Sequence, residues 1–403
     1  MNSATVPARE PAPETGSATT SSADARVAPG RVVSIDALRG FDMFWIVGGA
    51  GAFQGLLGLL VQPTPEWLAM QMKHVSWEGF TAWDLIMPLF LFIVGAAMPF
   101  SFGRRIAAGH SRSQIYRKVL LRFVILFVLG MVAQGNLLEF KLETLRLYSN
   151  TLQAIACGYL IASVALLQLP LLGQLVLTMA LVLGYWLLLV LVPTAGAGGP
   201  FDPQHNLAMV VDEFLLGRFR DGTTYTWILS SLGFGATVML GVFGGHLLHS
   251  AVAPWKKVGW LLFLGGSCLG LAWAWSSPAL GDWRCPIIKH IWSSSMILWA
   301  GGLSYLLLGL FYLLIDVCKW QRWAYLFIVI GANAIFAYMF WDLFGGDLRH
   351  MAETLVGGIA DGLSGTQSEP LARIGQALLK ITPFGLLWLA LWYMYRQRTF
   401  IRI

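Results

Sequence analysis

Residues 83–103 read WDLIMPLFLFIVGAAMPFSFG, and no charged side chain lies between Asp84 and Arg104. A helix needs ~20 mostly apolar residues to cross the hydrocarbon core of a bilayer, because each residue advances the helix by only ~1.5 Å. This stretch therefore predicts a membrane-spanning helix.

Nine further stretches meet the same requirement. They lie at roughly 41–61, 119–136, 151–169, 171–193, 227–249, 258–276, 293–315, 324–344 and 376–395. We therefore predict an all-α, polytopic integral membrane protein with about ten transmembrane helices, formed by one domain over residues 31–403.

The composition excludes an ordinary cytosolic enzyme. Only 12% of the 403 residues are charged and 57% are hydrophobic, whereas soluble domains carry about 25% charged residues. The four cysteines have no CxxC spacing, which argues against a disulfide framework or a zinc ribbon. We expect neither a bound metal ion nor a nucleic-acid partner.

Residues 1–30 are rich in Ala, Ser, Thr, Pro and Glu and contain no apolar run. Such a segment buries too little surface to become ordered, so we expect a disordered tail. Because it lacks the apolar stretch of a signal peptide, we expect the first membrane helix to direct insertion.

The distribution of basic residues predicts the orientation, because Lys and Arg are retained on the cytoplasmic side. Of the 27 Lys and Arg residues, 17 fall on the side of the N-terminus, together with 6 of the 21 acidic residues. We therefore expect a cytoplasmic N-terminus. The long loops at 62–82, 137–150, 194–226, 277–292 and 345–375 then lie outside.

The loop that enters the second helix, residues 74–88, reads HVSWEGFTAWDLIMP. Histidine changes charge near neutral pH, so His74 is a candidate general base or nucleophile. The alternative is an interfacial histidine that only forms hydrogen bonds within the loop. Trp77 and Asp84 are candidate substrate ligands, although Thr81 and Asp84 also have the spacing of a helix capping box.

Polar residues at other helix ends form further candidate sites. Asp36 and Arg39 lie one turn apart where the first helix begins, and they either orient an anionic cytosolic ligand or form a headgroup contact with its counter-charge. Asn150, Gln153 and Asn333 either line a polar cavity or join helices through hydrogen bonds.

A last group lies at the outer end of the eighth predicted helix. Lys289, Trp292 and Ser293 are suited to a sugar or a carboxylate, or they belong to an ordinary aromatic belt at the membrane interface.

These motifs together carry a resemblance to a known family. The segment at 34–40 (SIDALRG) followed by the one at 74–88 resembles the bacterial relatives of heparan-alpha-glucosaminide N-acetyltransferase. Shorter matches follow in the expected order over about 34–340: NTLQAI at 150–155, LLG at 215–217, KHIWS at 289–293 and GANAI at 331–335.

The resemblance implies a membrane-bound acetyltransferase of the bacterial inner (plasma) membrane. Such an enzyme takes acetyl from cytosolic acetyl-CoA and delivers it to an amine or hydroxyl of a sugar or glycan on the far side, with His74 as the catalytic histidine. We expect Asp36, Arg39 and Asn333 to bind acetyl-CoA, and Asn150 or Gln153 to stabilise the oxyanion.

Two alternatives to this activity come from other classes of protein. One is a transporter or flippase for a lipid-linked sugar, with polar residues in the bilayer as ligands; the other is a non-catalytic scaffold. We expect the lipid bilayer and the glycan acceptor as partners, and we allow for a homodimer.

The chain also departs from the family pattern at two positions. Where the heparan enzymes have an asparagine late in the first helix, this chain has Gly48-Gly49-Ala50, and an Asp-Pro-Glu-Gly stretch is replaced by residues 225–228 (YTWI). Both departures fall near the expected acceptor side.

Overall fold

The computed structural model describes residues 32–61, 63–194, 199–365 and 368–401, so the predicted tail at 1–30 lies outside the described residues. Within them the chain is all-helical and contains no β-strand. The helices are α1 (Val33–Phe44), α2 (Ala50–Leu60), α3 (Glu66–Gln71), α4 (Ile86–Ala107), α5 (Arg112–Ala133), α6 (Thr151–Gln168), α7 (Leu171–Leu191), α8 (Leu207–Leu216), α9 (Ser231–His249), α10 (Pro254–Ser276), α11 (Ser294–Phe311), α12 (Tyr325–Ala332), α13 (Ala334–Ser364) and α14 (Glu369–Arg396).

Eight helical segments of the described chain are long and apolar enough to cross a membrane, which confirms a polytopic membrane protein. They are Val33–Leu60, Ala82–Ala107, Thr151–Gln168, Leu171–Leu191, Ser231–His249, Pro254–Ser276, Ser294–Val317 and Glu369–Arg396. A ninth consists of Arg322–Ala332 and Ala334–Ser364, which meet at a bend of 71°. By length and apolarity together, the count is therefore one or two below the predicted ten.

The remaining predicted span falls on α5. This helix has 22 residues, a length of ~33 Å, but its first half carries four basic side chains, which lower its mean hydropathy. They are Arg112, Arg117, Lys118 and Arg122. Helix α5 packs along α6 and connects the end of α4 to the start of α6. With α5 included, each of the ten predicted stretches falls on one helix or on two consecutive helices.

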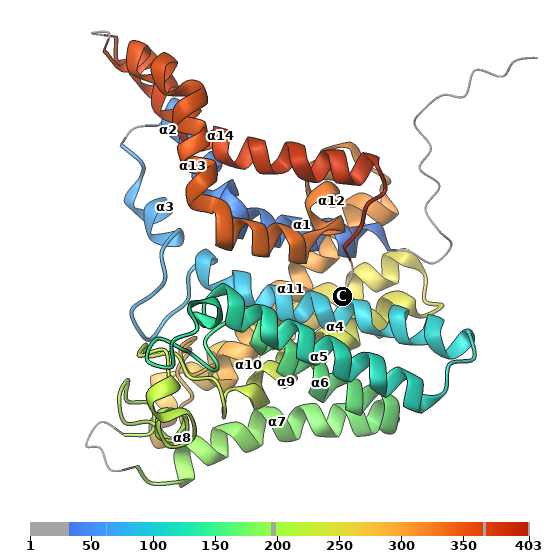
Figure 1. Cartoon of the computed structure of the whole chain (residues 1–403). Coiled ribbons are helices and arrows are strands. Elements are labelled where there is room, and N and C mark those ends of the chain that lie inside the picture. The colour runs from blue at the N-terminus through green and yellow to red at the C-terminus, as the bar shows by residue number, and fades with distance from the viewer. Residues whose placement is uncertain (1–31, 62, 195–198, 366–367, 402–403) are drawn as a thin grey trace, which may run out of the picture. The chain divides into compact units, whose positions relative to one another are not determined.

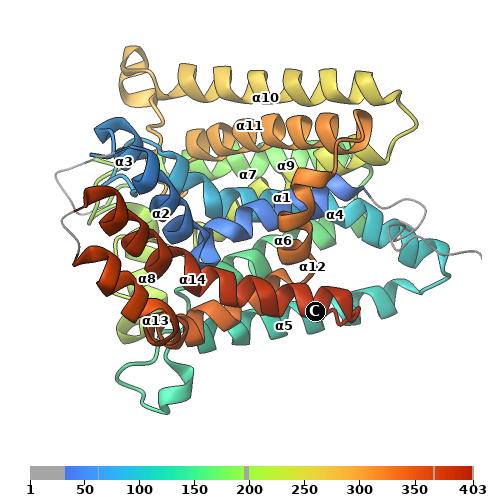
Figure 2. The ribbon, with the colours of Figure 1, turned by 90° about the horizontal axis from the view of Figure 1, so that it is seen from above.

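Most of the long helices, among them α4, α5 and α7, run along one common direction (Figure 1, Figure 2), whereas part of α13 turns away from it (Figure 1). Helix α4 lies at the centre of the bundle, where it contacts α1, α6, α9 and α11. Two thirds of its most apolar 18-residue window is buried, because neighbouring helices rather than lipid surround it. The middle of α4 therefore lies in the interior of the protein, whereas Arg104 and Ile106 in its last turn are exposed.

Glycines allow the closest of these helix contacts. A Cβ atom on Gly95 of α4 would overlap the carbonyl oxygen of Val238 on α9, and one on Gly241 of α9 would overlap the carbonyl oxygen of Phe92. Because both contacts are with backbone atoms, no side-chain movement would relieve the overlap. This pair of glycines fixes the distance between α4 and α9.

The first membrane span is interrupted by a kink at Trp45–Gly49, between α1 and α2, where Val47 and Gly48 have non-helical backbone angles. Gly48 has φ 91°, in the region that favours glycine, and a Cβ atom there would overlap the ring of Trp341. Glycine at position 48 is therefore required by the local backbone and by the tryptophan that packs on it.

Candidate functional site

Two loops distant in the sequence meet at one end of the bundle. Glu78 and Ile288 form an isolated antiparallel β-bridge, and the amide of Gly79 donates to the carbonyl of Ile287 at 2.9 Å. Arg284 forms an ion pair with Glu78 beside this bridge. These contacts bring the loop that contains His74 against the segment that precedes α11.

His74 and Asp84 form the central contact of this site. The Nδ1 atom of His74 lies 2.6 Å from Oδ1 of Asp84. The Asp84 side chain is 1% exposed, whereas that of His74 is 46% exposed. A buried carboxylate that accepts the Nδ1 proton fixes the ring and its tautomer, so Nε2 is the nitrogen that can take up a proton.

The second oxygen of Asp84 serves the backbone. Oδ2 accepts a hydrogen bond from the Thr81 amide at 3.1 Å, and the capping box expected from the sequence is present at the start of α4. The Val75 amide approaches the same oxygen at 3.4 Å. One carboxylate therefore both caps the helix and holds His74, which confirms the capping interpretation, while substrate binding by Asp84 stays a prediction.

Lys289 completes a buried group of charges. Its Nζ atom lies 3.4 Å from Oδ1 of Asp84 and 3.4 Å from Nδ1 of His74, and its side chain is 5% exposed. Burial lowers the pKa of Lys289, while the carboxylates of Asp84 and Asp42 oppose that shift. The structure thus joins three residues singled out in the sequence: His74, Asp84 and Lys289.

Asp42 extends this group into the bundle. It lies on α1, is fully buried, and its charge acts on Lys289. Among the described residues, neither of its carboxylate oxygens has a hydrogen-bond partner. Burying such a group is costly, and a charged residue inside a membrane helix is the sequence signal that identifies it. Our sequence reasoning did not include Asp42.

Aromatic side chains surround His290, the residue after Lys289. Tyr225 stacks on the imidazole at 4.2 Å between centroids, Trp77 meets it edge-on at 5.4 Å, and Thr224 Oγ1 lies 2.6 Å from Nδ1. Burial and the nearby Lys289 charge lower the pKa of His290. Tyr225 is the second site residue that sequence reasoning missed, because it comes from a different loop.

Asn150 and Gln153, the expected oxyanion ligands, are engaged in local structure. Asn150 caps α6 through the Leu152 amide at 2.7 Å and donates to the hydroxyl of Tyr338 at 3.0 Å. Gln153 bonds to the backbone of Ser149 and Leu147. Both amides therefore have the structural role that the sequence left as the alternative.

Asn333 lies at the 71° bend between α12 and α13. Its Nδ2 donates to the carbonyl of Thr399 at 3.1 Å, and its Oδ1 accepts from the amide of Ile401 at 2.9 Å. The side chain thus attaches the C-terminal segment to the bend. The expected acetyl-CoA contact is not needed to explain this buried amide.

Trp292 and Ser293 are also occupied by packing. Trp292 is 2% exposed and donates to Oγ1 of Thr237 at 3.0 Å. Ser293 donates to the carbonyl of Pro286 at 2.7 Å and accepts from the Ile288 amide at 3.0 Å. These two residues support the loop that presents Lys289, and the expected substrate contact would require them to exchange these partners.

A second group of charges lies near the other end of α4. The guanidinium carbon of Arg122 on α5 lies 4.6 Å from the ring centroid of Tyr159, and the charges of Arg39 and Arg105 both act on it. Within the described chain, Nε of Arg122 and Nη1 of Arg105 are buried without a hydrogen-bond partner. Arg39 also pairs with Asp36 at 3.0 Å.

Two of these three arginines, Arg105 and Arg122, have a buried N–H group without a partner among the described residues. Such a group of cations is a candidate anion site, since guanidinium groups bind phosphate through charge-assisted hydrogen bonds. Sequence reasoning had included Arg39 but not Arg122, which lies inside a helix. In contrast, the described residues contain no group of three His, Cys, Asp or Glu side chains that could hold a metal ion.

Residues 31–166 match the model of a family described as a domain of unknown function, DUF5009. The match covers about a third of the chain and extends from the start of α1 into α6, so it includes His74, Asp84 and the arginine group. None of the curated proteins matches the sequence.

Proposed function

We propose that this chain is a membrane-bound acyltransferase that moves an acetyl group from cytosolic acetyl-CoA to an amine or hydroxyl of a sugar on the opposite side of the membrane. The observation that carries the proposal is the contact between the half-exposed His74 and the buried Asp84, 2.6 Å long, beside the cation of Lys289.

The His74–Asp84 pair has the chemistry of a general base. With Nδ1 hydrogen-bonded to Asp84, Nε2 accepts the proton of the acceptor amine or hydroxyl while the acceptor nitrogen or oxygen attacks the thioester carbonyl. The new bond to the acetyl carbon forms while the carbon–sulfur bond breaks, and the proton on His74 passes to the departing thiolate. The nearby Lys289 cation favours the negative charge that develops on the carbonyl oxygen.

The arginine group supports a nucleotide-bearing donor. Phe102, whose ring lies 6.5 Å from that of Tyr159, follows Asp84 by 18 residues, or ~27 Å along a helix. An extended donor such as acetyl-CoA, with its phosphates at Arg39, Arg105 and Arg122, would reach toward His74 along this direction. The buried, unpartnered Asp42 lies on α1 between the two charged groups, one turn beyond Arg39.

The charge distribution of the sequence supports the direction of transfer. With the N-terminus in the cytoplasm, the arginine group faces the cytosolic donor and His74 faces the outer acceptor. The inner membrane of a bacterium is the location that fits this arrangement. A transporter of lipid-linked sugars remains the second candidate, and it is favoured only by the buried polar group of Asp42.

Binding and transfer of acetyl on the purified protein test the proposal. In lipid nanodiscs, radiolabelled acetyl-CoA should bind, and label should pass to an amino sugar such as glucosamine. A transporter or a scaffold would fail to bind acetyl-CoA, and that result would overturn the proposal.

Incubation without an acceptor distinguishes two mechanisms. If His74 itself carries the acetyl group, the protein becomes labelled, and the His74→Gln variant does not. If the three components react in one complex, the wild-type protein stays unlabelled although it still transfers acetyl when the acceptor is added.

A further inference from the structure

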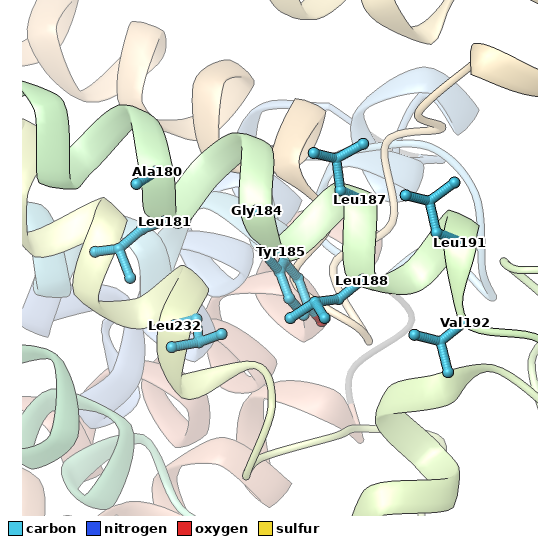
Figure 3. A pocket seen from close by; sticks show the side chains of 9 residues that line it. All are labelled: Ala180, Leu181, Gly184, Tyr185, Leu187, Leu188, Leu191, Val192 and Leu232. Carbon is cyan, nitrogen blue, oxygen red and sulfur yellow. The ribbon is translucent and has the colours of Figure 1, made fainter.

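An apolar groove of about 360 Å³ runs along the last three turns of α7. Its walls include Leu187, Leu188 and Leu191 from α7 and Leu232 from α9, and the buried side chain of Tyr185 forms its base (Figure 3). Leu187, Leu188 and Leu191 are exposed outside the bundle. Because α7 is apolar and long enough to span a membrane, hydrocarbon is the medium that meets this surface.

The groove shares a wall with the candidate site. The Tyr185 hydroxyl bonds to the carbonyl oxygen of Ile291 and lies 3.3 Å from Oγ of Ser230. Ile291 follows His290, whose ring contacts Trp77 and Tyr225. A single tyrosine therefore separates the groove from the segment that carries Lys289 and His290.

Packing shows that the two features adjoin the same buried cluster. Tyr185, Leu189, Ile288 and Ile291 form one small buried cluster, and both Trp77 and Leu232 pack against it. The groove therefore lies at the end of α7 nearest the His74 loop. With the predicted orientation, this is the outer half of the bilayer.

We infer that the acceptor is a lipid-anchored sugar whose hydrocarbon chain lies in the α7 groove while its head group reaches His74. This inference rests on the proposed acetyl transfer and names the class of its acceptor. The occupant is a lipid chain because the groove is apolar and opens outside the bundle on a membrane-spanning helix. The cluster that adjoins both the groove and the site places the head group of such a chain beside the polar loops.

Aromatic rings suit the head group at that point. Trp77 and Tyr225 are partly exposed and flank the His290 ring. Aromatic side chains with a polar end are favoured where one part of a ligand is apolar and the other hydrated. A sugar held against them has the His74 ring and the Lys289 cation as its neighbours.

A substitution that fills the groove tests the inference. A Cβ atom at Gly184 would meet no atom within 4 Å, so Gly184→Leu fits the backbone and places its side chain in the groove. Gly266→Leu on α10 is the matched control, because Gly266 is equally open and is no part of the groove. Both variants are compared with two acceptors, decyl glucosaminide and free glucosamine.

For decyl glucosaminide, Gly184→Leu should lower kcat/KM about tenfold or more, since a displaced chain misplaces the reacting head group. For glucosamine, both variants should match the wild type. Equal behaviour of Gly184→Leu and Gly266→Leu with the decyl acceptor would overturn the inference. Wild-type protein that acetylates neither acceptor would instead contradict the proposed function.

A binding measurement tests the inference without requiring catalysis. Decyl glucosaminide with a diazirine at the end of its chain should label the segment that contains Gly184 and Leu188, and unlabelled decyl glucosaminide should compete. Labelling spread evenly over the exposed faces of α7 and α10 would show bulk lipid only. A change from dimer to monomer in Gly184→Leu would show a second copy as occupant, and either result overturns the inference.

Discussion

Asp84 holds the imidazole of His74 through a 2.6 Å contact between Oδ1 and Nδ1, and the same carboxylate caps the helix at the centre of the bundle. The candidate base is therefore attached to a largely buried, central helix of the bundle, although it lies on a loop. A rigid support of this kind holds a catalytic group in one geometry.

Replacing His74 tests the pair directly. His74→Ala should reduce acetyl transfer by on the order of a hundredfold or more, because general base catalysis contributes 10²–10⁴-fold. Acetyl-CoA binding and the thermal midpoint should change little, since the side chain is half-exposed. His350→Ala is the control, because His350 is exposed on α13 and pairs with Glu353. A His74→Ala protein that keeps its activity would contradict catalysis by His74 and would favour a histidine that only forms hydrogen bonds within the loop.

Asp84→Asn should reduce acetyl transfer and also stability. The amide accepts fewer hydrogen bonds than the buried carboxylate, which bonds to the Thr81 amide and to His74, so a loss of about 1–3 kcal/mol in the free energy of unfolding is expected. Activity and thermal midpoint measured together on His74→Ala and Asp84→Asn should separate the two roles. An Asp84→Asn protein with full activity would contradict the orienting role.

Arg122 tests the anion site. Arg122→Gln should raise the Kd for acetyl-CoA about tenfold or more, because a charge-assisted hydrogen bond to phosphate contributes ~1.5–3 kcal/mol. Arg39→Ala should act in the same direction. Arg104→Ala removes a charge from an exposed position at the same end of α4 and should have a smaller effect. If all three variants raised the Kd for acetyl-CoA equally, and high salt abolished the differences from the wild type, only a general electrostatic attraction would be indicated.

The orientation follows from labelling with an impermeant thiol reagent. In a background without the four native cysteines, Lys141→Cys should react from the outside of intact cells and Ser113→Cys should not. Both positions are exposed: Ser113 lies in the first turn of α5, and Lys141 lies in the loop that follows the other end of α5. The reverse pattern would place His74 on the cytosolic side and exclude the proposed direction of transfer.

The contact between α4 and α9 predicts a large packing effect. Gly95→Ala places a Cβ atom against the carbonyl oxygen of Val238, and overpacking of this kind costs ~1–3 kcal/mol. Gly103→Ala on the same helix meets no atom within 4 Å and should be neutral or slightly stabilising. Thermal midpoints of the two variants in the same nanodiscs should differ clearly, and equal midpoints would contradict the close contact.

Asp212 predicts a pH-dependent stability. Burial raises its pKa to about 6, although the amides of Trp227 and Ile228 oppose the shift. A carboxyl with a raised folded-state pKa stabilises the fold below about pH 4, and this contribution is lost as the pH rises through about 6.

The Asp212→Asn variant cannot ionise, so it should gain stability relative to the wild type between pH 4.5 and pH 7.5. The gain should be of order 1–3 kcal/mol, because one pKa unit corresponds to about 1.4 kcal/mol. Thermal midpoints of both proteins at the two pH values measure it. A difference that is the same at pH 4.5 and pH 7.5 would show that Asp212 does not titrate in this range.

Local pattern was sufficient for the helices and for the capping box. An apolar run such as residues 83–103 needs a helix in the bilayer because its backbone groups find no other partners there. The spacing of Thr81 and Asp84 identified where the helical segment leading into α4 begins, because a capping box binds the free amides at a helix N-terminus. The four basic side chains of α5 lower its mean hydropathy, and hydropathy does not distinguish the exposed Arg112, Arg117 and Lys118 from Arg122, which packs against Tyr159.

The roles of the amides required the tertiary structure. The sequence left Asn150, Gln153 and Asn333 between ligand binding and structural bonding, since an amide serves both purposes equally well. Only the folded chain brings the partners, Tyr338 for Asn150 and the C-terminal backbone for Asn333. These partners lie 66 to 188 residues away in the sequence, and spacing carries no information over such distances.

What the sequence determined by itself is therefore the class of protein, the course of its helices and the loop that carries His74. What only the tertiary structure decided is which charges meet. Lys289 lies 205 residues from Asp84, and Arg122 joins Arg39 from a different helix. The free energy of transfer into the bilayer depends on each residue's own side chain, so it can be read from the sequence. Buried charges, in contrast, are tolerated only where helices from distant parts of the chain bring them together.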